Sequence, residues 1–152
     1  MEKQNMSVGF ADLTNFRLLV DTVGSEKTVE YLQEAFKVAG DKIINYGGKI
    51  HKYIGDTILF TFDDPNNAVS AAKEIAGYIK EVGSITLRFN IGIATGEVLI
   101  VKIGHPSYLV DDILGETVNR AAILSREAGK SESGVAFCEE TMKWEKDKGC
   151  RM

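Results

Sequence analysis

The sequence predicts an α+β sandwich, in which an antiparallel sheet packs against helices. Two observations support this fold class. Stretches of alternating hydrophobicity, typical of half-buried strands, are interleaved with stretches of helical spacing. Hairpin-like pairs of strands also recur, which favours antiparallel pairing. The length of 152 residues is that of one domain, so we expect residues 1–152 to form a single unit.

The first half of the chain alternates between strand-like and helix-like patterns. A serine that can cap a helix starts the first helical stretch, and a Gly-Gly pair ends it. Asp64-Pro65 is a cap with a proline in the first turn of the next helix. The predicted elements are a strand over Ser7–Asp12, a helix from Ser25 to Gly47, strands over Lys49–Ile54 and Thr57–Phe62, and a helix from Asp64 to Val82.

The second half continues in the same way and ends in a short polar segment. The predicted elements are strands over Leu87–Ala94 and Glu97–Ile103 with a turn at Thr95-Gly96, an extended Tyr108–Leu114, a helix over Thr117–Ala128, a strand over Gly134–Cys138 and a helix over Glu139–Lys148. The first part of this order is that of a ferredoxin-like βαββαβ core with its helices on one face. An added C-terminal hairpin, helix and strand follow it.

The composition excludes several classes of protein. Hydrophobic residues make up 44% of the chain, yet no apolar run approaches the ~18 residues of a membrane span. The N-terminus lacks the apolar core of a secretion signal, so we expect a cytoplasmic protein or the cytoplasmic domain of a larger one. The net charge of −4 argues against a nucleic-acid partner. Two scattered cysteines form neither a zinc motif nor a disulfide framework.

The predicted topology brings two carboxylates together. The first and third strands of such a core are antiparallel neighbours, so the end of one lies beside the start of the other. Asp12 ends the first strand and Asp56 begins the third, which places them about one strand spacing apart (~5 Å). Paired carboxylates repel each other and favour a bound cation. Their hard oxygen ligands suit Mg²⁺, which commonly binds together with substrate phosphates.

Four segments of the chain resemble the catalytic domain of the class III nucleotide cyclases. They occur in the family's order and spacing, and the resemblance extends over residues 7–142. The segments are Phe10–Phe16, Lys52–Asp56, Gly92–Val98 and Asp112–Ala122.

The resemblance implies a role for each matching residue. Two ions of Mg²⁺ or Mn²⁺ would be held by Asp12, Leu13 and Asp56. The turn made by Leu13, Thr14, Asn15 and Phe16 would hold the triphosphate, as helix N-termini favour anions. Lys52 and Asp112 match the pair that selects adenine, whereas guanylate-type members typically carry Glu with Cys or another small polar residue. Asn119 matches the asparagine that orients the ribose.

The implied activity is that of an adenylate cyclase, which converts ATP to 3′,5′-cyclic AMP and pyrophosphate by two-metal-ion catalysis. In the family, Lys52 and Asp112 of one subunit would face Asp12 and Asp56 of the other. The resemblance therefore implies a head-to-tail homodimer, and it also implies regulatory domains in the full-length protein.

Two positions depart from the family pattern. Ile123 stands where the family has an arginine that stabilises charge on the reacting phosphate. Arg126, at i+7 from Asn119, lies on the same helical face and is the alternative catalytic cation. A catalytically weak or silent nucleotide-binding domain is the other interpretation. The family's last hairpin has no match after Trp144. A diguanylate-type cyclase is disfavoured, because Tyr53–Thr57 only partly matches that signature.

Overall fold

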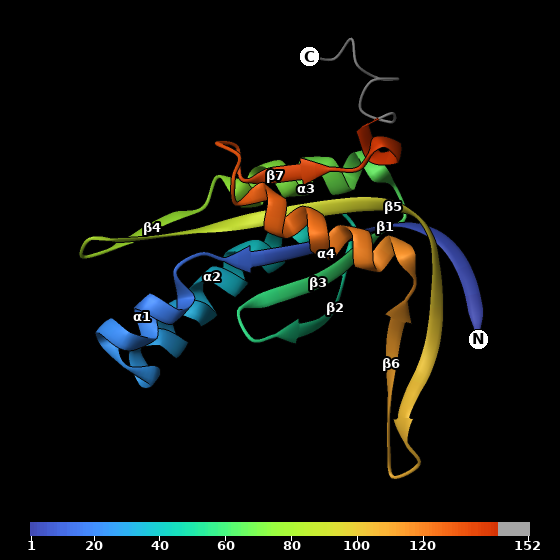
Figure 1. Ribbon diagram of the computed structural model, residues 1–152, viewed down its shortest axis with the longest axis horizontal. Coiled ribbons are helices and arrows are strands. Elements are labelled where there is room, and N and C mark those ends of the chain that lie inside the picture. The colour runs from blue at the N-terminus through green and yellow to red at the C-terminus, as the bar shows by residue number, and fades with distance from the viewer. Residues whose placement is uncertain (143–152) are drawn as a thin grey trace.

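A seven-stranded sheet forms the centre of the computed structural model, which describes residues 1–142 (Figure 1). Five strands follow the order β2-β3-β1-β5-β4, and β6 and β7 each pair with β5. All pairs are antiparallel except β5 with β7. The elements are β1 (Glu2–Leu13), α1 (Phe16–Val23), α2 (Ser25–Asn45), β2 (Lys49–Ile54), β3 (Thr57–Phe62), α3 (Pro65–Ala76), β4 (Ile79–Val82), β5 (Ile85–His105), β6 (Tyr108–Leu114), α4 (Glu116–Ala128) and β7 (Val135–Phe137).

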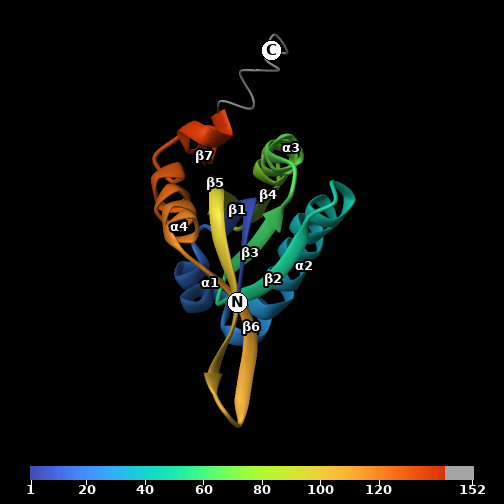
Figure 2. The same cartoon turned by 90° about the vertical axis from the view of Figure 1, so that its right-hand side faces the viewer.

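Helices cover both faces of the sheet. On one face, alternate residues of β3 and β5 pack with α2 and α3 to form the larger core, which includes Phe60 and Phe89. On the other face, a smaller core around Leu59 and Val98 packs beneath α4. Figure 2 shows α4 on one side of the sheet and α2 and α3 on the other. The predicted α+β sandwich and its core are confirmed, while the placement of α4 on the second face was not predicted.

The third helix is shorter than the sequence predicts. It ends at Ala76 with Gly77 as its cap, and residues Ile79–Val82 form the edge strand β4 instead of a last helical turn. The prediction was wrong here because Ile75, Ile79 and Val82 fit helical spacing, whereas backbone pairing of Ile79–Val82 with β5 forms an edge strand. A turn at Gly83, which has φ +62°, then returns the chain into β5.

The predicted turn at Thr95-Gly96 is also wrong, because β5 runs unbroken through it for 21 residues. Both residues pair with β1, Thr95 with Ser7 and Gly96 with Met6. Close packing against α4 explains the glycine at position 96, because a Cβ there would lie 2.7 Å from Oγ1 of Thr117. The same continuous pairing extends β1 back to Glu2, beyond the predicted start at Ser7.

The far end of β5 and all of β6 form an arm that projects from the body of the protein (Figure 1). Apolar side chains on this arm are exposed, namely Ile103, Tyr108, Leu109, Val110 and Leu114. Residues 139–142 are helical, as predicted, and residues 143–148 of that predicted helix lie outside the described part of the chain. Within residues 1–142, no helix is both long and apolar enough to cross a membrane.

Candidate active site

The structure brings Asp12 and Asp56 together at the end of β1, as the topology predicted. Asp12 pairs with Thr57, the first residue of β3, and Asp56 lies in the turn just before it. The backbone N–H of Leu13 donates to the carbonyl oxygen of Asp56 at 3.2 Å. The hydroxyl of Thr57 donates to Oδ1 of Asp12 at 2.6 Å and holds that carboxylate in place.

The electrostatics of this pair favour a cation. Burial raises the pKa of Asp56 above its ordinary value, and the negative charge of Asp12 raises it further, against the lowering effect of hydrogen bonds from the Asp56 backbone and from Thr57. Within residues 1–142, no group of three or more His, Cys, Asp or Glu side chains is placed to hold a metal ion. A cation bound here would thus rely on the two carboxylates, backbone oxygens, water and substrate phosphates, a ligand set that suits Mg²⁺.

The turn after β1 is fixed to β5 by hydrogen bonds. The N–H of Thr14 donates to the carbonyl of Arg88 at 2.8 Å, and Nδ2 of Asn15 donates to the carbonyl of Thr86 at 2.8 Å. Asn15 has φ 59° and stands at the N-terminus of α1, where it makes no side-chain cap. No acidic residue occupies the first turn of α1, so the positive end of the helix is not neutralised by a side chain.

Lys52 and Asp112 form an ion pair between β2 and β6. Nζ of Lys52 donates to Oδ2 of Asp112 at 2.9 Å, and the Asp112 side chain is only 14% exposed. The other carboxylate oxygen accepts the N–H of Ile113 at 2.8 Å, which fixes its orientation. The two side chains are 60 residues apart in sequence, and the resemblance alone indicated that they belong together.

The remaining predicted residues lie on α4. Asn119 and Arg126 are exposed, as is Ile123, whose relative accessibility is 47%. Three- and four-residue spacings place these side chains on one stripe of the helix. The stripe therefore presents an amide, an apolar side chain and a guanidinium, with the guanidinium one turn later than the family pattern has it.

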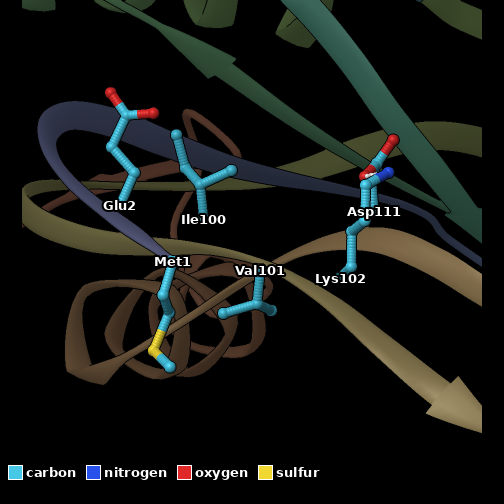
Figure 3. A pocket seen from close by; sticks show the side chains of 6 residues that line it. All are labelled: Met1, Glu2, Ile100, Val101, Lys102 and Asp111. Atoms are coloured by element: carbon cyan, nitrogen blue, oxygen red, sulfur yellow. Dashed lines mark hydrogen bonds and ion pairs between the residues drawn. The ribbon is translucent and has the colours of Figure 1, made fainter.

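The cavity at the base of the projecting arm contains none of these residues. It has a volume of about 420 Å³ and lies between the start of β1 and the β5–β6 pair. Figure 3 shows its lining side chains, among which Lys102 and Asp111 form an ion pair of 2.7 Å. A second cavity, of about 340 Å³, lies beside the start of α4 and includes Arg120. Neither cavity includes Asp12, Asp56, Lys52 or Asp112.

Some residues that support the site were not predicted. Thr57 was passed over, although its place directly opposite Asp12 follows from the predicted pairing of the two strands. Thr86 and Arg88 contribute only backbone groups to the turn, namely both carbonyls and the N–H of Arg88, so their side chains carry no signal. His51 lies beside Lys52, and its ring Nε2 is hydrogen-bonded to the hydroxyl of Thr61 at 2.7 Å.

An α+β sandwich that brings two carboxylates together at the end of β1 agrees with the fold of nucleotide cyclase domains. The chain belongs to the family of the adenylate and guanylate cyclase catalytic domain, whose model it matches over residues 1–152. Among curated proteins it is similar to the uncharacterized protein Rv1318c of Mycobacterium tuberculosis, with 29% identity over 141 residues and 88% of this chain covered. The chain spans 26% of that relative's length.

Solved structures of cyclase domains share the fold. A bacterial light-regulated adenylyl cyclase matches with a TM-score of 0.83 and 21% identity, covering 94% of this chain and 80% of its own. The non-canonical dimeric guanylyl cyclase domain of the RhoGC fusion protein from the aquatic fungus Blastocladiella emersonii matches with a TM-score of 0.80 and 19% identity. That match covers 97% of this chain and 86% of its own. Adenylyl and guanylyl cyclases thus have the same fold as this chain.

Proposed function

We propose that this chain is the catalytic domain of an adenylate cyclase, which converts ATP to 3′,5′-cyclic AMP and pyrophosphate. The observation that carries the proposal is the Lys52–Asp112 pair, held at 2.9 Å. An ammonium can donate to a ring nitrogen of adenine, and a carboxylate can accept from its exocyclic amine. The fixed orientation of Asp112 supports this role, because an acceptor that is already oriented loses little freedom when the base binds.

Asp12, Leu13 and Asp56 would hold two ions of Mg²⁺ or Mn²⁺. The donor set fits, because two carboxylates with a raised pKa at Asp56 gain from a nearby positive charge. When bound, the ions would stabilise charge on the ribose oxygen and on the phosphates.

The other residues of the site position the substrate. The first amides of α1 and the turn Leu13–Phe16 would bind the triphosphate, and Asn119 would orient the ribose. In the reaction, the ribose 3′-hydroxyl loses its proton to water and its oxygen bonds to the α-phosphorus, while the bond from the α-phosphorus to the bridging oxygen breaks and pyrophosphate leaves. Arg126 would offset the charge that develops on the α-phosphate.

A head-to-tail homodimer belongs to the same proposal. Each site would combine Lys52 and Asp112 of one protomer with Asp12 and Asp56 of its partner. The exposed apolar side chains of the β5–β6 arm support an association of this kind. The short span of the chain within its curated relative supports the presence of regulatory domains in a longer protein. We also propose a cytoplasmic location, where ATP is available.

Product analysis tests the proposal directly. The protein is incubated with ATP, GTP, CTP and UTP in parallel, with Mg²⁺ and with Mn²⁺, and the products are separated by chromatography. We expect cyclic AMP from ATP, with no product after chelation of the metal or in Asp56→Ala. Cyclic GMP as the main product would overturn the substrate assignment.

The exposed Ile123 favours a second candidate, a nucleotide-binding domain with little or no turnover. A transition-state cation is often worth about 10²–10³ in rate, so its absence alone would nearly silence the site. ATP binding in calorimetry without any cyclic product, in both the natural chain and Ile123→Arg, supports this candidate. Turnover that depends on Arg126 excludes it.

A further inference from the structure

We propose that Thr57 is a positioning residue that orients the carboxylates of Asp12 and Asp56 for metal binding. The inference rests on the proposed function in one respect, because the metal is the Mg²⁺ or Mn²⁺ proposed for that site. The hydroxyl of Thr57 donates to Oδ1 of Asp12 at 2.6 Å, although the two residues are 45 positions apart in sequence. Thr57 lies directly after the segment Lys52–Asp56, outside the four segments that carry the family resemblance.

The strand register places Thr57 and Asp12 on the same face of the sheet. The two residues pair across β1 and β3, two positions beyond the pair of Phe10 with Leu59, whose side chains belong to the smaller core beneath α4. Because every second side chain of a strand points to the same face, Asp12 and Thr57 point to the face of that core. The Cβ atoms of directly opposite residues lie about 4.5–5.5 Å apart, so a short hydroxyl reaches the carboxylate across from it.

The side chain of Thr57 suits an orienting contact. Branching at Cβ restricts its χ1 angle, so the hydroxyl loses little freedom when it donates. The backbone around the contact is fixed as well, since the N–H of Leu13 donates to the carbonyl of Asp56 at 3.2 Å. Within residues 1–142, no side chain donates to the other carboxylate oxygen of Asp12, Oδ2. That oxygen therefore stays available to a cation while Oδ1 is held.

Thr57 also acts on the second carboxylate. Burial raises the pKa of Asp56, and a hydrogen bond from Thr57 opposes that rise. A hydroxyl has one proton and donates it to one acceptor at a time, so Thr57 cannot satisfy both carboxylates at once. Its proton holds the pair together without neutralising either charge. The arrangement thus keeps two oriented negative groups at one place, which is what a divalent cation requires.

Two effects of the hydroxyl on metal affinity oppose each other. Hydrogen-bond partners of metal ligands typically contribute about 10–100-fold to metal affinity, because they fix the orientation of the ligand. The same hydroxyl also offsets part of the repulsion between the two carboxylates, which reduces their need for a cation. Asp12 and Asp56 are both half-buried, so water screens part of that repulsion. We therefore expect the orienting effect to be the larger one.

Thr57→Val tests the inference, because valine keeps the branched shape and removes the hydroxyl. Electron paramagnetic resonance measures the binding of Mn²⁺ to the nucleotide-free protein, a readout that needs no catalysis. We expect the Kd for Mn²⁺ to rise about tenfold in Thr57→Val and to stay within about twofold of the natural value in Thr57→Ser. Thr61→Val is the matched control on the same strand, since it removes a hydroxyl that is hydrogen-bonded to His51, and it should leave this Kd unchanged.

Equal Kd values in the natural chain and in Thr57→Val would overturn the role of Thr57, as would an equal rise in Thr57→Val and Thr57→Ser. A loss of Mn²⁺ binding in Asp56→Ala alongside either result would leave the metal site of the proposed function in place. If the natural chain binds no Mn²⁺, or if Asp56→Ala does not weaken the binding, the metal site itself is refuted and the inference with it, so the two failures are distinguishable. Thr57→Ala, with the same expected rise, replaces Thr57→Val if that variant does not fold.

Discussion

The close approach of α4 to the backbone of Gly92 on β5 predicts that any side chain at this position displaces the helix. A Cβ at this position would lie 2.2 Å from the backbone nitrogen of Ser125 and 2.5 Å from the carbonyl oxygen of Ala121. Both are backbone atoms of α4, so no side-chain rotation can relieve the contact. In Gly92→Ala, the helix must move off the sheet by roughly 1 Å to reach ordinary contact distances.

The cost should approach the upper end of the range for overpacking, about 3 kcal/mol of unfolding free energy. In a chain of this size, that loss of unfolding free energy corresponds to a fall in Tm of about 6–12 °C. Because the same helix carries Asn119, a displacement of roughly 1 Å should also lower turnover about 10²-fold under the proposed function. Urea and thermal unfolding followed by circular dichroism measure the first effect.

Gly96→Ala is the matched control on the same strand. Its Cβ would meet only Oγ1 of Thr117, a side-chain atom that can rotate away at the loss of its 2.8 Å hydrogen bond to the carbonyl of Glu97. We expect a cost of about 1 kcal/mol. An unfolding free energy for Gly92→Ala within about 0.5 kcal/mol of the natural chain would refute the reasoning, as would equal costs for the two variants.

Three further predictions concern the site. Because burial and Asp12 raise the pKa of Asp56 above 3.8, the folded state keeps this proton to higher pH than the unfolded chain. Stability from this group is therefore present below that value and is lost as pH rises through the raised pKa; Asp56→Asn should flatten that part of the curve in urea unfolding from about pH 3 to pH 7, and an unaltered curve would contradict the assignment. Lys52→Glu combined with Asp112→Cys should shift the main product from cyclic AMP toward cyclic GMP by at least about tenfold, measured with both nucleotides in competition. Arg126→Ala should lower kcat about 10²-fold at saturating ATP and Ile123→Arg added to it should restore most of the loss, whereas an unchanged kcat in Arg126→Ala would refute the role of Arg126.

Local patterns predicted the strands that alternate clearly. The bounds of β2 and β3 match because Gly55-Asp56 is a turn signal between two short alternating runs. The same reasoning failed for Ile79–Val82, since Ile79 and Val82 continue the helical spacing of the preceding residues and four residues are too few to show the alternation of a strand. The predicted turn at Thr95-Gly96 was wrong for another reason. Gly96 makes room for α4 rather than for a turn, and a neighbour that is distant in sequence leaves no local signal.

Some residues of the candidate site could likewise be placed from the sequence, and others could not. The proximity of Asp12 and Asp56 followed from strand order alone. Because β1 and β3 are antiparallel neighbours, the end of β1 lies beside the start of β3. The pairing of Lys52 with Asp112 did not, since it depends on the path of β6 along β5. That path is a tertiary feature that packing determines, and only the family resemblance pointed to the pair. The exposed position of Ile123 likewise became visible only once α4 was placed.

The length of β5 gives one strand two very different local stabilities. From Phe89 to Ala94 it is paired with β1 and covered on both faces, so its amides should exchange with solvent only when the whole domain unfolds. From Val101 to His105 it is paired with β6 alone, and there local opening should expose the amides far more often. The arm can therefore fray and re-form while the sheet stays intact. Asp112 pairs with Val101, the first residue of the less stable region. Its hydrogen bonds to Lys52 on β2 and to the N–H of Ile113 oppose local opening at this position.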